Sequence, residues 1–200
     1  AMYGVLSAAT LKALEDAGQF AEAYAALASA NALTRKSVPW DATAHSAWID
    51  QIAAAFAQPV AAASPEAQGS EVIFVVSLPR SGSTLTEQIL SAHSQVEGAS
   101  ELPDLPAIIE EESRRRGHPY PGWVGDASPE DWARLGQAYL DRTARWREQL
   151  PRFTDKGLSN WAYVGAIMAM LPQARVVICR RDPLETCFSC FQQLFARGQD

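Results

Sequence analysis

The chain has 200 residues, of which 48% are hydrophobic and 20% charged, and its formal net charge is −6. This length fits one α/β domain of ordinary size, or part of a larger one, together with a small appendage. The negative charge argues against a nucleic-acid-binding protein held by bulk electrostatics, because that mode requires a basic surface. The sequence shows neither a run of 18 apolar residues nor the basic and apolar regions of a signal peptide. We therefore expect no membrane span and a cytoplasmic location.

Residues 1–57 are rich in alanine and predict helices. Small and large side chains alternate there at the spacing of a helical hairpin, and this order resembles the second half of a tetratricopeptide repeat. The residues that carry the order are Gly18, Phe20, Ala23, Leu27 and Ala30. One repeat cannot bury its own apolar face, so it would have to end a longer array or pack against the next part of the chain. An unrelated pair of amphipathic helices is the alternative.

One break in the helical pattern lies inside this segment, and another follows it. Pro39 interrupts the helical pattern, and Asp41 can cap the next helix. Residues 58–70 contain two prolines and a glycine among alanines and serines, which is the composition of a linker. The sequence therefore predicts a helical segment at 1–57, a linker at 58–70 and an incomplete α/β domain at 71–200.

The α/β part opens with the apolar segment 72–77, which predicts a parallel strand covered on both faces. Further strands are expected at 95–98, 152–155 and 174–179, and helices at 84–93, 128–150 and 161–171. This alternation predicts a P-loop-like parallel sheet with flanking helices. The run from Glu110 to Arg116 changes from acidic to basic and predicts a solvated helix face.

Four charged residues each come after a predicted strand: Arg80, Glu101, Lys156 and Arg181. In an open parallel sheet, ligands bind in the crevice beyond the carboxyl ends of the strands. We therefore expect one rim of the sheet to carry all four side chains.

The segment Pro79-Arg-Ser-Gly-Ser-Thr84 has the character of a phosphate-binding loop. Gly82 permits close backbone approach, while Ser83, Thr84 and the helix start can donate hydrogen bonds to an anion. The lysine and the first glycine of the Walker motif are missing, which argues against a magnesium-dependent nucleoside triphosphatase. Arg80 offers a planar bidentate fork instead.

A second anion site is predicted after residues 174–179. Asp182 and Pro183 have the character of an N-cap and a first helical residue. Arg181 before the cap and Ser189 on the second turn can then clamp one phosphate, although Arg181 could instead pair with Glu185 on the surface.

Cys187 and Cys190 have C-x-x-C spacing without a second Cys/His pair, which favours small buried side chains over a zinc or redox site.

Two anion sites imply a ligand with phosphates at both ends. Together they resemble the 5′-phosphosulfate loop and the 3′-phosphate site of sulfotransferases that use 3′-phosphoadenosine 5′-phosphosulfate (PAPS). The segments Gly98-Ala-Ser-Glu-Leu-Pro103, Thr154-Asp-Lys156 and Arg180-Arg-Asp-Pro183 look most similar to bacterial tetratricopeptide-linked sulfotransferases, relatives of the tyrosylprotein enzymes. The resemblance covers about residues 72–195, and faintly 10–32.

The resemblance implies that the chain transfers the sulfuryl group of PAPS to a hydroxyl or amine acceptor without a metal, releasing 3′-phosphoadenosine 5′-phosphate (PAP). The residues implied to bind the nucleotide are Arg80, Ser81, Gly82, Ser83 and Thr84 at the 5′-phosphosulfate and Arg181 and Ser189 at the 3′-phosphate. Glu101 matches the catalytic base, and Lys156 matches the lysine near the bridging oxygen. Positive charge from Arg80 and Lys156 would stabilise the leaving oxygen.

The sequence leaves alternatives to this interpretation. Pro103 stands where the tyrosylprotein enzymes carry an arginine, which disfavours a peptide-tyrosine acceptor, and His93 is a rival base. A kinase-like phosphoryl-transfer enzyme and an inactive tetratricopeptide-type interaction protein are the competing functions. The expected partners are PAPS, an unidentified hydroxyl acceptor, and a protein or peptide bound by the N-terminal helices. The family pattern continues beyond Asp200, so we expect a fragment of a longer protein.

Overall fold

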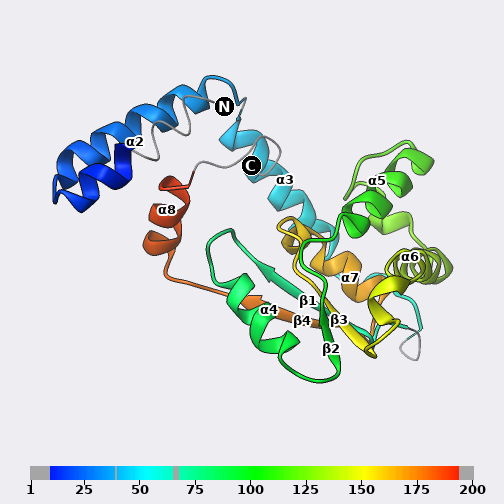
Figure 1. Ribbon diagram of the computed structural model, residues 1–200. Helices are drawn as coiled ribbons and strands as arrows, with labels where there is room; N and C mark the ends of the chain where they lie inside the picture. Colours follow the sequence, from blue (N-terminus) through cyan, green and yellow to red (C-terminus); the bar gives the residue numbers. More distant parts are fainter. Residues whose placement is uncertain (1–9, 39, 65–67, 194–200) are drawn as a thin grey trace. The chain divides into compact units, whose positions relative to one another are not determined.

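The computed structural model describes residues 10–38, 40–64 and 68–193, with helices and strands labelled as in Figure 1. The chain divides into two compact units. One unit joins the described residues of Ala1–Ala42 and of Asp182–Asp200, and the other is Thr43–Arg181. The division into domains at 57 and 71 stays a prediction.

The centre of the larger unit is a parallel sheet of four strands, seen side by side in Figure 1. The strands are β1 (Val72–Ser77), β2 (Val96–Gly98), β3 (Arg152–Asp155) and β4 (Arg175–Cys179). Their order is β2-β3-β1-β4. In the register, Val72 pairs with Phe153 and Ser77 with Cys179. The predicted α/β class and parallel sheet are confirmed, and the predicted strands agree with the observed ones to within one residue.

Helices of this unit cover both faces of the sheet. They are α3 (Ala42–Ala55), α4 (Ser83–Ser91), α5 (Asp104–Arg116), α6 (Pro129–Arg142) and α7 (Val164–Met170). Three 3₁₀ helices accompany them at Val124–Asp126, Ala144–Arg147 and Asn160–Tyr163. Alternate residues of β1 belong to the core formed with α5, α6 and α7. Helix α4 lies on the other side of the sheet (Figure 1) and contacts β1, β2 and β3.

Two predicted helices are shorter in the structure. The helix expected at 128–150 begins with a capping box between Ser128 and Asp131 but ends at Arg142. The buried hydroxyl of Thr143 donates to the carbonyl oxygen of Tyr139 at 2.7 Å, and a separate 3₁₀ turn comes next. The segment expected as one helix at 161–171 is divided between a 3₁₀ helix and α7.

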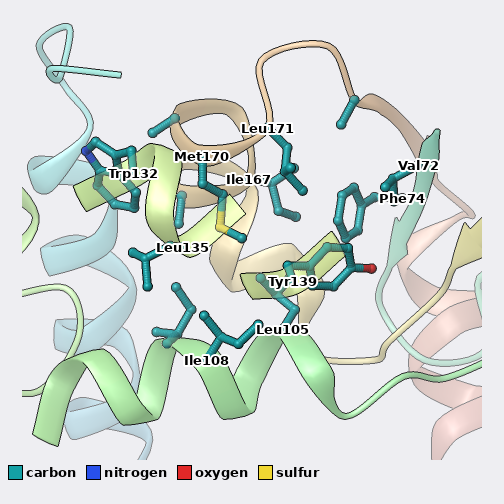
Figure 2. Packing of buried hydrophobic residues seen from close by; sticks show 14 of the residues in the cluster. Val72, Phe74, Leu105, Ile108, Trp132, Leu135, Tyr139, Ile167, Met170 and Leu171 are labelled. Atoms are coloured by element: carbon teal, nitrogen blue, oxygen red, sulfur yellow. The ribbon is translucent and has the colours of Figure 1, made fainter. Parts of the chain in front are cut away.

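The core lies between the sheet and the three helices α5, α6 and α7. Figure 2 shows Phe74 of β1 beside Tyr139 of α6, and their ring centroids are 5.5 Å apart. Helix α6 approaches α7 closely at Gly136, where an added Cβ would overlap the carbonyl oxygen of Met170. Burial of Trp132, Tyr139 and Phe74 excludes water from this layer.

Residues of the predicted linker pack on this core. The backbone N–H of Ala63 donates to the carbonyl oxygen of Ala169 at 2.8 Å. The side-chain amide of Gln68 donates to the carbonyl oxygen of Ala133 at 2.8 Å. The described part of 58–70 is therefore held against α6 and α7 by specific hydrogen bonds.

The prediction of a solvated face at 110–116 is wrong for Glu112. Its side chain is only 1% exposed, and its carboxylate accepts hydrogen bonds from Arg115, Arg116 and Arg134. Asp131 of α6 accepts from the same arginines, so the two helices share one charge cluster. An acidic-to-basic run alone could not show that α6 would bring a third arginine and a second carboxylate.

The smaller unit contains α2 (Phe20–Arg35) and α8 (Pro183–Phe191). The side-chain amide of Asn31 donates to the carbonyl oxygen of Phe191 at 2.8 Å, and the Tyr24 and Phe191 rings lie 5.7 Å apart. Ala23 and Leu27 are buried on α2. The likeness of this segment to a tetratricopeptide repeat stays a prediction.

The predicted start of α8 is confirmed. Asp182 is the N-cap, and its side chain accepts from the backbone N–H groups of Leu184 and Glu185 at 2.9 and 3.1 Å. The prediction of a buried Cys187 is wrong, because this side chain is exposed.

No helix in the described part of the chain has the length and apolar character needed to cross a membrane.

Candidate functional site

The carboxyl edge of the sheet gathers four of the predicted residues. All four strands run in the same direction, so their carboxyl ends meet at one edge. The strand order sets the spatial order of the residues along this edge. Glu101 follows β2, Lys156 follows β3, Arg80 follows β1 and Arg181 follows β4, and they lie in that order. The rim expected from the sequence is therefore present.

The loop between β1 and α4 contains the segment that the sequence predicts to bind an anion. Helix α4 begins at Ser83, and Gly82 before it has φ 93°. An added Cβ at Gly82 would meet no atom within 4 Å, so the space over the loop backbone is open to a ligand. Ser81 and Ser83 are buried, whereas Arg80 and Thr84 are exposed. Arg80 has the left-handed φ of 64°, which no local sequence signal predicted.

Glu101 and Lys156 form an ion pair although 55 positions separate them. The Lys156 Nζ lies 3.0 Å from the Glu101 Oε1. The lysine side chain is 7% exposed and the glutamate side chain 44%. A carboxylate in this arrangement is oriented by a buried cation and still faces solvent, so it can take a proton from an incoming group.

Arg181 and the loop are also connected. The Arg181 Nη1 donates to the carbonyl oxygen of Arg80 at 3.3 Å, so the end of β4 is tied to the end of β1. Ser189 lies on α8 and belongs to the other unit. Its predicted pairing with Arg181 on one phosphate therefore stays a prediction.

His93 lies at the opposite edge of the sheet. It comes after α4 and just before β2, whose first residue, Val96, donates its backbone N–H to the His93 carbonyl oxygen at 3.1 Å. Its Nδ1 accepts from the Gln95 backbone N–H at 3.2 Å. Because Glu101 comes after β2 and His93 precedes it, the structure does not support His93 as a base at the rim.

Two buried carboxylates behind the rim, those of Glu87 and Asp155, were missed by the sequence analysis. Glu87 lies on the sheet side of α4, four residues after Ser83, and this spacing was the available signal. Asp155 directly precedes Lys156. Burial raises the pKa of Asp155, while hydrogen bonds from Tyr139, Gly157, Asn160 and Leu102 act to lower it.

In the described part of the chain, no group of three or more His, Cys, Asp or Glu side chains is arranged to hold a metal ion.

A comparison with protein families identifies the chain. A family model described as the sulfotransferase family matches residues 72–200, which is the larger part of the sequence. The chain belongs to the sulfotransferase family. An uncharacterized protein of Aquifex aeolicus (strain VF5) is 34% identical to this sulfotransferase chain over 200 residues. The match covers 92% of the chain but 25% of the Aquifex protein, so the chain spans about a quarter of that relative.

The matched range of this sulfotransferase contains the loop at 79–84 and the residues Glu101, Lys156 and Arg181. The family assignment made from the two anion-site motifs is confirmed. A closer kinship to tetratricopeptide-linked or tyrosylprotein sulfotransferases, and the role of each residue, stay predictions.

Proposed function

We propose that the protein transfers the sulfuryl group of PAPS to a hydroxyl or amine acceptor at the carboxyl edge of the sheet. The observation that carries this proposal is the ion pair of Glu101 and Lys156, whose Oε1 and Nζ atoms lie 3.0 Å apart. This pair lies on the same rim as the loop at 79–84. Membership of the sulfotransferase family supports it.

The residues of the loop fit the 5′ end of PAPS. Arg80, Ser81, Ser83, Thr84 and the backbone at Gly82 would hold the phosphosulfate, helped by the positive dipole end of α4. The open space at Gly82 and the exposed Arg80 side chain leave room for such a group. Arg181 and Ser189 would hold the 3′-phosphate.

When bound, PAPS supplies the sulfuryl group and a phosphate leaving group. Glu101 removes the proton of the acceptor as the acceptor oxygen or nitrogen forms its bond to sulfur. Lys156 orients the Glu101 carboxylate through its Oε1. Lys156 and Arg80 also provide positive charge for the phosphate oxygen that loses its bond to sulfur, which is where negative charge grows.

Calorimetric titration tests the nucleotide assignment. We expect PAP to bind roughly 10- to 150-fold more tightly than adenosine 5′-phosphate, since a charge-assisted bond to the 3′-phosphate contributes about 1.5–3 kcal/mol. Arg181→Ala should remove this difference. Arg175→Ala is the matched control, because Arg175 is exposed at the other end of β4.

Two results would contradict the proposal. Equal affinity of the unmodified protein for the two nucleotides would reject the 3′-phosphate site. Tighter binding of magnesium ATP than of PAP would favour a phosphoryl-transfer enzyme instead.

A further inference from the structure

Two buried carboxylates stand behind the rim. Glu87 of α4 is 8% exposed and Asp155 of β3 is fully buried. Among the residues that the structure describes, neither carboxylate lies within ion-pair distance of a lysine or arginine. Burying a carboxylate is costly unless its oxygens accept hydrogen bonds. The donors on these two groups therefore show what the groups hold in place.

Glu87 connects α4 to the ends of β2 and β3. Its Oε1 accepts from the Thr154 hydroxyl at 2.7 Å and from the Ser100 backbone N–H at 2.9 Å. The Thr154 hydroxyl accepts in turn from the Ala99 backbone N–H at 3.3 Å. Ser100 has the left-handed φ of 63°, a conformation that costs energy for a residue with a Cβ. The carboxylate thus stabilises the turn immediately before Glu101.

Asp155 holds the part of the chain that follows Lys156. Its Oδ1 accepts from the Gly157 backbone N–H at 3.0 Å and from the Asn160 amide at 2.9 Å, and its Oδ2 accepts from the Tyr139 hydroxyl at 2.7 Å. Asp155 therefore contacts the residue directly after Lys156.

These bonds fix the backbone on either side of the Glu101–Lys156 pair. Ser100, before Glu101, is bonded to Glu87, and Gly157, after Lys156, is bonded to Asp155. The Lys156 N–H also donates to the Ser100 carbonyl oxygen at 2.9 Å. We propose that Glu87 and Asp155 are positioning residues that set the distance between the Glu101 carboxylate and the Lys156 amine. Their catalytic importance rests on the proposed function of that pair. Misplacing a catalytic group by about 1 Å can reduce a rate by about 100-fold.

The main experiment compares two substitutions at Glu87. Both bonds go to a single oxygen, so Glu87→Gln can keep them, whereas Glu87→Met has similar volume and no equivalent acceptor. We expect Glu87→Met to reduce kcat by about 100-fold while the affinity for PAP stays unchanged, and Glu87→Gln to retain most of the activity. Glu110→Met, at an exposed position of α5, is the control and should behave like the unmodified protein.

A second measurement does not depend on activity. Acetylation of Lys156 by acetic anhydride, analysed by peptide mass spectrometry, reports how well the lysine is held in its buried pair. We expect slow modification in the unmodified protein and in Glu87→Gln, and clearly faster modification in Glu87→Met. Thr154→Val removes one of the two bonds to Glu87 with little change of volume and should give a smaller increase, which provides a test if Glu87→Met does not fold. Asp155→Asn should also accelerate modification.

The outcomes separate the two proposals. Unchanged Lys156 reactivity in Thr154→Val and in the folded Glu87 and Asp155 variants would overturn the positioning role. An equal increase in Glu87→Gln and Glu87→Met would also overturn it, because the acceptor oxygen would then be irrelevant. If the variants show the expected reactivity but the unmodified protein neither binds PAP nor transfers sulfuryl groups, the proposed function fails and the structural positioning stands.

Discussion

At the scale of single residues, Glu101 and Lys156 have unequal environments. Lys156 is almost completely buried, while nearly half of the Glu101 side chain faces solvent. A carboxylate that served only to neutralise the lysine would not need this exposure. The exposure suits a group that must meet an acceptor, which is the role that we propose for Glu101.

Replacing Glu101 by glutamine tests this role. The amide oxygen can still accept the Lys156 hydrogen bond, but the amide cannot take a proton from the acceptor. We expect turnover to fall by at least about 100-fold, because general base catalysis typically contributes 10² to 10⁴ in rate. Affinity for PAP and the melting temperature should change little.

Steady-state kinetics, calorimetry and thermal unfolding of this variant distinguish the two possible roles. Near-normal turnover would reject Glu101 as the base. A large fall in melting temperature with a matching loss of PAP binding would show that the glutamate serves the fold instead.

At the scale of the secondary-structure elements, the charge cluster between α5 and α6 makes stability depend on pH. Burial alone raises the pKa of Glu112, but hydrogen bonds from three arginines lower it to about 2 from its usual 4.5. The folded-state pKa is below the unfolded one, so the stabilisation is complete above about pH 4.5 and is lost as the pH falls toward 2. The loss should be on the order of 3 kcal/mol.

Urea unfolding between pH 2 and 7 measures this effect. Glu112→Gln should lower the stability near neutral pH, because it leaves three arginines without their shared carboxylate, and it should flatten the dependence on pH in the acidic range. Glu110→Gln is a matched control on the same helix, since the Glu110 side chain is 67% exposed. A slope in Glu112→Gln equal to that of the unmodified protein would contradict the assignment.

The contact between α6 and α7 depends on a glycine. An added Cβ at Gly136 would overlap the Met170 carbonyl oxygen and would come within 2.6 Å of the Gln68 amide nitrogen. Because the neighbouring backbone cannot move without disturbing α7, we expect Gly136→Ala to reduce the free energy of unfolding by about 1–3 kcal/mol. Chemical denaturation measures the change. Gly125→Ala, where an added Cβ meets no atom within 4 Å, should have little effect.

At the scale of the whole molecule, charge is distributed unevenly. The net charge is −6, yet three of the four predicted site residues along the carboxyl edge of the sheet are cations: Arg80, Lys156 and Arg181. In our proposal these cations and the start of α4 meet the negative charge of the sulfuryl donor. In this proposal, local positive charge would hold an acidic donor on a protein whose net charge is negative.

Treatment with a chelator tests whether these cations suffice. We expect turnover of the full-length protein to be unchanged after dialysis against EDTA. Loss of activity that magnesium restores would instead support the phosphoryl-transfer alternative.

Local patterns in the sequence determined the strands, the loop at 79–84 before α4 and the start of α8. Apolar runs, a loop of small hydroxyl residues before a helix, and an Asp-Pro cap depend on neighbouring residues only. These features sufficed to predict the parallel sheet and the rim of Arg80, Glu101, Lys156 and Arg181. The family was predicted from the resemblance of the motifs to known sulfotransferases, and the family match confirms it.

Tertiary structure alone decided which of these charged groups meet and which become buried. The pairing of Glu101 with Lys156 depends on β2 lying beside β3, and the burial of Glu112 depends on an arginine from α6. Likewise, only the direction of β2 shows that His93 and Glu101 lie at opposite edges. Such contacts join residues far apart in the chain, and their energy depends on burial and distance in the folded molecule, which no local pattern records.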